Sequence, residues 1–220
     1  MPKSNIMPKS NMPSSNQDLS VRDRLLAVAA VHFAEHGLQG ASQRAIQREV
    51  GVNPGAANYY FKTKEALYVS VIENALEPIL AERLTHLETV PENTDFLERL
   101  RYLLRSYLGP MVREADTPAG HSYLRIVAAQ FSHADIAKDA MELKVAAVRE
   151  RYIELLSKMF PAASRNRLYE VLTICVSISA TIPTQSRPED LNKARIAAMV
   201  EDMTEISVLI FRRLCDPTHP

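Results

Sequence analysis

The sequence is poor in the residues that build disulfide frameworks and metal centres. It holds two cysteines, Cys175 and Cys215, which lie 40 positions apart in 220 residues. This spacing matches neither a disulfide framework nor a metal-binding motif. The apolar neighbours of Cys175 predict a thiol packed in the core. Cys215, near the C-terminus, is expected to have no functional role. We therefore expect no cofactor and no metal.

Long hydrophobic runs are also lacking. The most apolar stretch, residues 171–182, is followed by Pro183. It is about 12 residues long, whereas a bilayer-spanning helix needs roughly 18 to 20. The first residues lack the apolar segment of a secretory signal. These features predict a cytoplasmic protein without a membrane partner.

Glycine and tryptophan are scarce, with six and none, and alternating β-branched runs are few. Alanine, leucine, glutamate and arginine instead recur at helical spacing, which predicts an all-α fold of about nine helices. Pro78 implies a bend or a new start in the long helix that follows Thr63. The predicted helices cover residues 20–37, 42–50, 54–60, a long stretch from 64, 94–115, 119–132, 136–159, 164–182 and 188–214.

The chain has no net charge, but its charges are unevenly distributed. Residues 1–64 carry eight bases and four acids, a net charge of +4, and the remainder carries −4. A basic end on an acidic body is expected of a DNA-binding module joined to another domain. Residues 1–18 nearly repeat the unit MPKSN and predict a disordered arm. An arm that enters the minor groove through Lys3 and Lys9 is the alternative interpretation.

Residues 42–67 have the pattern of a helix, a tight turn and a second short helix. Ile46 and Val50 share one helical face, and Gly51 supplies the positive φ that ends a helix. Asn53 is a good N-cap, and Pro54 suits the first helical position because its missing N–H costs nothing there. The second helix therefore begins at Pro54.

The second helix begins with small residues and continues with hydrogen-bonding ones. Its exposed positions are expected to be Gly55, Ala56, Asn58, Tyr59 and Tyr60. Such a helix end can approach a DNA groove closely, whereas the next residue, a phenylalanine, is expected to turn back into the core. The sequence thus indicates a helix-turn-helix that binds double-stranded DNA.

The end of this segment resembles the TetR family of transcriptional regulators. In that family the short recognition helix is followed by a pattern like Tyr-x-x-Phe-x-x-Lys-x-x-Leu, and Asn58, Phe61, Lys64 and Leu67 occupy the four places here. Many members have tyrosine where this chain has Asn58 and histidine where it has Tyr60. The resemblance is strong over residues 20–70 and weak beyond them.

The resemblance implies a helix-turn-helix domain at residues 19–66, joined by a long helix to a ligand-binding and dimerisation domain at residues 67–220. It also implies a homodimeric repressor that binds a palindromic operator and is released by a small-molecule effector. The pair Asn58-Tyr59 resembles the branch with fatty-acid-responsive regulators, so an acyl compound is the first choice of effector and a planar aromatic the second. The expected DNA-binding residues are Ser42, Arg44, Asn53, Pro54, Gly55, Ala56, Asn58, Tyr59, Tyr60 and Lys64.

Polar residues within apolar helical stretches are candidates for the effector site. Each has the alternative of a satisfied polar residue in the core. Arg105 or Arg125 would receive a carboxylate or a thioester-linked phosphate. The set is Tyr102, Arg105, His121, Tyr123, Arg125, Gln130 and Tyr169.

The last two predicted helices carry broad apolar faces with small residues between them. The resemblance implies that such a pair meets its symmetry mate in a four-helix interface, and two-fold symmetry would supply two half-sites on DNA. Intramolecular core is the alternative. The candidate interface residues are Leu172, Thr173, Val176, Ala180, Met203, Ile206, Ile210 and Leu214.

Two other classes of function must be weighed. His32, Glu35 and His36 match the H-x-x-E-H pattern of inverted zinc peptidases. That site needs a third ligand in a cleft, whereas Phe33 and Gly37 fit a helix that packs and ends, so we do not expect an enzyme. The other class is a helical scaffold that binds protein and has lost its affinity for DNA.

Overall fold

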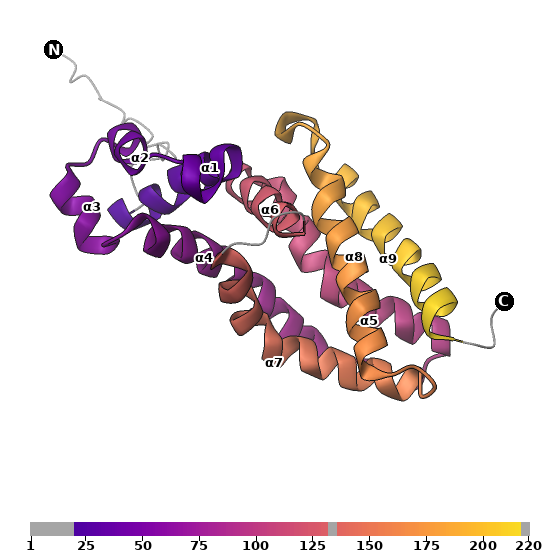
Figure 1. Ribbon diagram of the computed structural model, residues 1–220. Helices are drawn as coiled ribbons and strands as arrows, with labels where there is room; N and C mark the ends of the chain where they lie inside the picture. Colours follow the sequence, from indigo (N-terminus) through magenta and orange to yellow (C-terminus); the bar gives the residue numbers. More distant parts are fainter. Residues whose placement is uncertain (1–19, 132–135, 217–220) are drawn as a thin grey trace, which may run out of the picture.

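The computed structural model describes residues 20–131 and 136–216, without the side chains of Ala56 and Ala57. The arm predicted at residues 1–18 lies outside these ranges. Within them the chain forms α-helices and two short 3-10 helices and no strand, which confirms the predicted all-α fold (Figure 1). The helices are α1 (Val21–Gly40), α2 (Gln43–Val50), α3 (Pro54–Tyr60), α4 (Lys64–Glu88), α5 (Phe96–Arg113), η1 (Glu114–Asp116), α6 (Pro118–Gln130), α7 (Ile136–Met159), α8 (Arg165–Thr184), η2 (Pro188–Asp190) and α9 (Lys193–Cys215).

Side-chain caps determine where most of these helices begin. The cap is a serine, threonine, aspartate or asparagine whose oxygen accepts a hydrogen bond from a backbone N–H of the first turn. In α4, for example, the Thr63 hydroxyl accepts from the N–H of Ala66 at 3.0 Å. The other caps are Ser20, Ser42, Asp95, Thr117, Ser164 and Asn192.

Helices α1 to α3 and the first turns of α4 pack together as a small unit, and the core of this unit is continuous with that of α6. Phe33 of α1 and Tyr68 of α4 meet edge to face, with ring centroids 4.8 Å apart. Ile46 of α2 and Phe61 complete this core and are almost fully buried. The α1 helix is interrupted at Gly37, where φ is 65° and ψ is 177°, at the predicted end of the first helix.

The helix α4 is a single helix that belongs to both halves of the molecule. It runs through Pro78 without a new start, so of the two predicted effects of this proline, a bend or a new segment, the new segment does not occur. Pro78 is exposed, and its ring therefore meets solvent and not the core. The buried face of α4 continues from Leu67 and Val71 near its start to Ile79 further along. The same helix thus contributes to the small unit and to the larger body.

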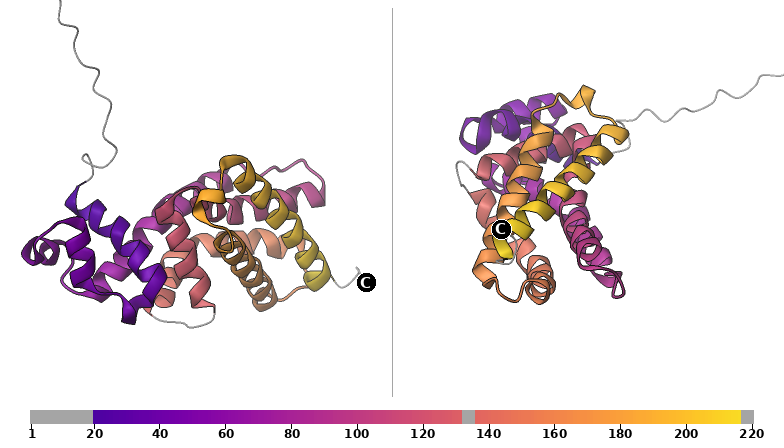
Figure 2. Two further views of the ribbon diagram at one scale, coloured as in Figure 1. Left: turned by 90° about the horizontal axis from the view of Figure 1, so that it is seen from above. Right: turned by 90° about the vertical axis from the view of Figure 1, so that its right-hand side faces the viewer.

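The larger body is a helical bundle in which α5 packs against α9, α4 against α7, and α6 against α8. Its core contains Leu103, Tyr152, Leu168 and Phe211. Views from two directions place α3 at one end of the molecule and the last turn of α9 near the other (Figures 1 and 2). None of the helices in the described ranges is both long and apolar enough to cross a membrane.

Both cysteines are free and buried. Burial raises the pKa of the Cys175 thiol to about 11 and that of the Cys215 thiol to about 11 as well. Both are therefore thiols and not reactive thiolates at neutral pH. The prediction of a packed thiol at Cys175 is confirmed.

The start of α6 lies so close to η1 that only glycine fits at position 120. A Cβ atom at Gly120 would lie 2.1 Å from the Glu114 carbonyl oxygen, which is backbone and cannot swing away. We expect Gly120→Ala to lower the free energy of unfolding by about 2 kcal/mol, the usual cost of overpacking. Urea unfolding followed by circular dichroism measures this.

The matched control is Gly109→Ala, also within a helix. There the new Cβ would meet the Nη1 atom of Arg113 at 2.9 Å, which is the movable end of a long side chain. Helical propensity favours alanine over glycine by about 1 kcal/mol, so this variant should keep its stability. Equal stability of the two variants would contradict the close packing of α6 on η1.

Candidate nucleic-acid interface and internal cavity

The turn between α2 and α3 has the predicted geometry. Gly51 has φ 75° in the left-handed region, and its N–H donates to the Arg48 carbonyl oxygen. The next N–H, that of Val52, donates to the Gln47 carbonyl oxygen at 3.1 Å. These bonds satisfy the last carbonyls of α2 and direct the chain into α3 at Pro54.

The outer face of α3 carries hydrogen-bonding groups that no other part of the fold covers. Asn58 is exposed, and the side chains of Tyr59 and Tyr60 are 82% and 42% exposed. The two tyrosine rings meet edge to face with centroids 5.2 Å apart. Phe61, in contrast, is buried, as predicted. Amide and hydroxyl groups are therefore exposed on α3, and this helix lies at one end of the molecule (Figure 1).

The other residues predicted to contact DNA lie around this face. Ser42 caps α2 by accepting from the Ala45 N–H at 3.3 Å, and both Ser42 and Arg44 are exposed. Asn53, Pro54 and Gly55 are exposed in the turn and the first turn of α3. Ala56 belongs to α3, but its side chain is outside the description.

Lys64 has a structural role that the sequence did not reveal. Its Nζ atom donates to the carbonyl oxygens of Gln39 and Ala41, both at 3.1 Å. An ammonium group is a good partner for the carbonyls at the end of a helix. Lys64 thus ties the start of α4 to the end of α1, and part of its hydrogen-bonding capacity is already used there.

The H-x-x-E-H pattern of α1 does not assemble a metal site. The Nε2 atom of His32 lies 2.8 Å from the Oε2 atom of Glu49 on α2, so His32 joins two helices of the small unit. His36 lies 3.7 Å from its neighbour Glu35 on the surface. In the ranges that the structure describes, no three His, Cys, Asp or Glu residues are grouped to hold a metal ion.

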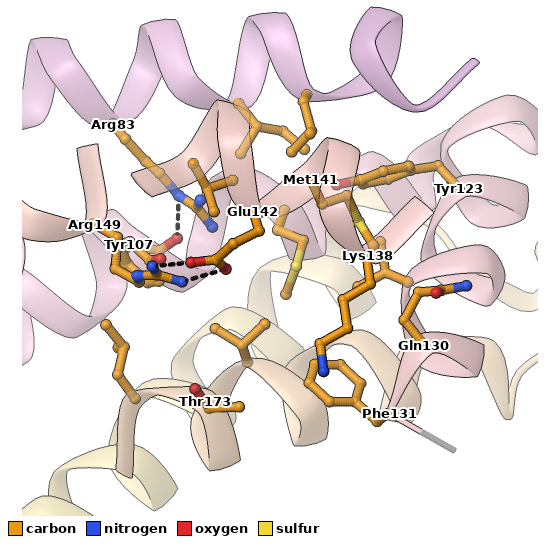
Figure 3. A pocket seen from close by; sticks show the side chains of 17 residues that line it. Arg83, Tyr107, Tyr123, Gln130, Phe131, Lys138, Met141, Glu142, Arg149 and Thr173 are labelled. Atoms are coloured by element: carbon orange, nitrogen blue, oxygen red, sulfur yellow. Dashed lines mark hydrogen bonds and ion pairs between the residues drawn. The ribbon is translucent and has the colours of Figure 1, made fainter. Parts of the chain in front are cut away.

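A cavity of about 440 Å³, partly open to solvent, lies between α4, α5, α6, α7 and α8 (Figure 3). Its wall is largely aliphatic. The apolar lining consists of Leu76, Ile79, Met111, Val127, Phe131, Met141, Val145, Leu172 and Val176. A volume of this size is typical of small-molecule sites.

Charged groups gather on one side of the cavity. Arg83 of α4 is 4% exposed, and its Nε atom donates to the Tyr107 carbonyl oxygen at 2.7 Å. Its guanidinium lies 4.0 Å from the centroid of the Tyr107 ring, a cation–π contact. Arg149 and Glu142 form a two-bond ion pair next to it (Figure 3). Lys138 lies on the other side, near Phe131.

Two of the predicted effector residues, Tyr123 and Gln130, line this cavity. Arg83 was missed, although its position was visible in the sequence. It follows Leu76 by seven positions and Ile79 by four, and these spacings place an arginine on the buried face of α4.

The other five predicted effector residues do not line the cavity. The Tyr102 hydroxyl donates to the His86 carbonyl oxygen at 2.8 Å, and Arg105 pairs with Glu201 on α9. These side chains connect helices of the bundle. The Nε2 atom of His121 lies 3.2 Å from the Ser186 carbonyl oxygen. Arg125 is exposed, and the ring centroid of Tyr169 lies 5.1 Å from the Arg149 guanidinium.

The predicted dimer residues separate into buried and exposed sets. Leu172, Ala180 and Met203 are buried within the protomer, which favours for these three the alternative of intramolecular core. Thr173 and Val176 line the cavity. Ile206 and Leu214 are each 38% exposed, and Ile210 is half-buried. The exposed apolar residues of α8 and α9 that the structure describes are Ile174, Ile182, Ile206, Leu209 and Leu214.

An exposed helix-turn-helix at one end and a helical body with a cavity define the class of two-domain helix-turn-helix regulators. The model for bacterial regulatory proteins of the tetR family matches residues 25–71. The model for the C-terminal domain of tetracyclin-repressor-like proteins matches residues 105–206. The chain belongs to the TetR family, whose members are regulators and not enzymes.

Curated relatives include two repressors. The chain is 34% identical over 96 residues to the HTH-type transcriptional repressor AcnR of Corynebacterium diphtheriae, covering 38% of this chain and 48% of that protein. It is 33% identical over 85 residues to the repressor KstR2 of Mycolicibacterium smegmatis, covering 39% and 40%. The match thus spans about half the length of these relatives or less.

Solved structures share the fold over nearly the whole chain. A TetR-like regulator from Rhodococcus sp. RHA1 has a TM-score of 0.55 at 15% identity, covering 89% of this chain and 96% of that one. The fatty acid degradation regulator FadR of Bacillus halodurans has a TM-score of 0.56 at 18% identity, covering 91% and 97%. At these identities the likeness establishes the fold.

The contacts of Lys64 predict an effect on stability that is independent of DNA. Lys64→Met removes both bonds to the end of α1, and we expect the free energy of unfolding to fall by about 1 kcal/mol. Lys62→Met serves as the control, because Lys62 is an exposed lysine two positions away. Denaturant unfolding without DNA measures both, and equal stability would argue against the tie between α1 and α4.

Proposed function

We propose that the chain is a homodimeric, DNA-binding transcriptional repressor that leaves a palindromic operator when a small molecule fills the cavity. The uncovered face of α3, with Asn58, Tyr59 and Tyr60 at one end of the molecule, is the observation that carries the proposal. The repressor names of the curated relatives support it.

On DNA, α3 lies in the major groove and α2 crosses the backbone. Asn58 has the amide that pairs bidentately with adenine, and Tyr59 offers a hydroxyl for phosphate and a ring edge for thymine methyl groups. Ser42 and Arg44 are placed for phosphates, as is any N–H of Lys64 that α1 leaves available. Bases then specify the sequence, and phosphates set the position.

The exposed apolar residues of α8 and α9 form the proposed dimer interface. Leu209 is 63% exposed and Ile206 is 38% exposed on α9, and Ile174 is 40% exposed on α8. Burial of such side chains against a second copy would remove apolar surface from contact with water, which favours association. A two-fold dimer also supplies two α3 helices for the two half-sites of a palindrome.

The helix α4 connects the cavity to the DNA-binding unit. Its first residue, Lys64, is bonded to the end of α1, and Leu76, Ile79 and Arg83 further along line the cavity. A ligand that fits better when α4 has shifted draws the protein toward that state, because only differential affinity moves an equilibrium. The spacing of the two α3 helices then no longer matches the operator.

Selection from random duplexes tests the DNA-binding role. We expect the full chain to enrich a two-fold symmetric sequence, and an absence of enrichment would favour a protein-binding scaffold. Asn58→Ala should reduce discrimination at one base pair of each half-site by about 1 to 3 kcal/mol. Arg44→Ala should weaken binding to all DNA sequences alike. It should also lower the slope of log binding constant against log salt concentration by about 1 per half-site. The same kind of loss in both variants would contradict this division of roles.

The dimer surface has a direct test in solution. Leu209→Glu places a charge in the proposed interface, so sedimentation velocity should show a shift from dimer to monomer, with loss of operator binding. Leu143→Glu is the matched control, because Leu143 on α7 is also highly exposed but lies outside this surface. Dissociation of both variants, or of neither, would argue against an interface on α8 and α9.

A further inference from the structure

Arg83 is a buried cation that no acid in the described part of the chain neutralises. The single hydrogen bond of its side chain among the described residues runs from Nε to the Tyr107 carbonyl oxygen. A guanidinium has five N–H donors, so its two terminal nitrogens keep their hydrogen-bonding capacity. Burying a charge without an opposite partner is costly, and an anion in the cavity would relieve that cost.

The neighbouring acid does not fill this role. Glu142 is held by the Arg149 guanidinium, and this contact lowers the pKa of the Glu142 carboxyl. Arg149 and Glu142 neutralise each other, and Lys138 adds a further positive charge to the cavity wall. With Arg83 and Lys138 left, the wall has an excess of positive charge.

The Tyr123 hydroxyl is a second polar group without a partner in the described part of the chain. Tyr123 is 2% exposed, and its hydroxyl points toward the middle of the cavity, beside Met141 (Figure 3). Burial raises the pKa of Tyr123 far above its usual value, and the charge of Arg83 acts on it in the opposite direction. The hydroxyl therefore stays protonated and can donate, and Arg83 is near enough to influence it.

The rest of the wall suits an unbranched apolar body. Leu76, Ile79, Val127, Val145, Leu172 and Val176 present aliphatic groups to the cavity. The volume of about 440 Å³ is large enough for the aliphatic part of such a ligand. Because the cavity is partly open to solvent, the chemistry of its wall, and not its volume, indicates which head group it binds.

We propose that the effector is a free, linear aliphatic monocarboxylate, with its carboxylate bound by Arg83 and the Tyr123 hydroxyl. This rests on the proposed function, in which the cavity is the effector site. The planar guanidinium offers two parallel N–H groups to the carboxylate, the strongest pairing available to an acid. The chain of the ligand lies among the aliphatic side chains.

The test is calorimetric titration of the full chain with dodecanoate, its methyl ester and dodecanoyl-coenzyme A, below their micelle concentrations. We expect dodecanoate to bind at least about tenfold more tightly than the methyl ester, because a charge-assisted pair is lost in the ester. An ester or a thioester that binds as tightly as the acid would overturn the proposal. Tighter binding of a planar aromatic acid of equal size would overturn the linear aliphatic assignment.

Two variants locate the carboxylate. Arg83→Gln should remove most of the preference for acid over ester. Tyr123→Phe should weaken the binding of dodecanoate by roughly tenfold and that of the ester by less, because a neutral carbonyl accepts a weaker hydrogen bond than a carboxylate. Tyr123→Phe keeps the ring and so remains informative if Arg83→Gln does not fold. Arg113→Gln is the control, because Arg113 of α5 pairs with Glu82 and does not line the cavity. Unchanged acid binding in Tyr123→Phe and folded Arg83→Gln would refute the assignment.

Val176→Phe tests the position of the aliphatic chain. Val176 lines the cavity, so a larger side chain there should shift the preferred acid to a shorter length. An unchanged length preference would place the ligand elsewhere and contradict the proposal.

The operator assay separates the two proposals. Suppose that the wild-type protein selects a palindrome, but that dodecanoate neither binds the protein nor releases it from the DNA. The carboxylate inference then fails and the repressor function stands. If no DNA is selected while dodecanoate binds through Arg83, the cavity chemistry stands and the repressor function fails.

Discussion

The packing of α4 along one continuous core is the constraint on which the rest of the structure depends. Leu67, Val71 and Ile79 of this helix all belong to the buried cluster that also includes Phe33 of α1 and Tyr123 of α6. One rigid element therefore connects the exposed face of α3 to the cavity. The Lys64 ammonium, bonded to two carbonyl oxygens at the end of α1, attaches the start of α4 to the small unit. A shift of α4 must move that unit, since bonds and packing both oppose separation.

The cavity is unusual because its wall includes a buried arginine. Removing a guanidinium from water costs several kcal/mol unless other interactions compensate. Here the Tyr107 carbonyl oxygen and the Tyr107 ring compensate in part, and the Tyr152 hydroxyl lies 3.1 Å from the Arg83 carbonyl oxygen on the same helix. These contacts hold Arg83 in place but leave its charge exposed to whatever enters the cavity. The free energy of burying the Arg83 charge is less favourable when the cavity is empty than when it holds an anion. The cavity therefore favours anionic ligands.

Local signals in the sequence were enough to predict the helices. Ser42, Gly51 and Thr63 mark helix ends through caps and a positive φ, which depend on a few adjacent residues. The exposure of α3 and the burial of Phe61 also followed from local periodicity.

The cavity could be predicted only in part, because its wall depends on how five helices meet. Tyr123 and Gln130 were identified, but Arg105 turned out to face Glu201 on α9, and Arg125 faces solvent. An apolar stretch does not show which neighbour each face will contact. Leu172 illustrates this: its apolar side chain was compatible with a dimer interface, but in the structure it lines the cavity.

The helix α8 has the cavity on one side and an exposed apolar face on the other. Leu172, Thr173 and Val176 line the cavity, while Ile174 of the same turn faces away and is 40% exposed. Under the proposed function, a ligand in the cavity and a second copy at the outer face contact the same helix, so α8 is a route by which the two binding events can be coupled. Linkage is reciprocal, so any factor by which association alters affinity for a cavity ligand is the factor by which that ligand alters association. The affinity of a ligand measured in dilute protein would then differ from its affinity in concentrated protein.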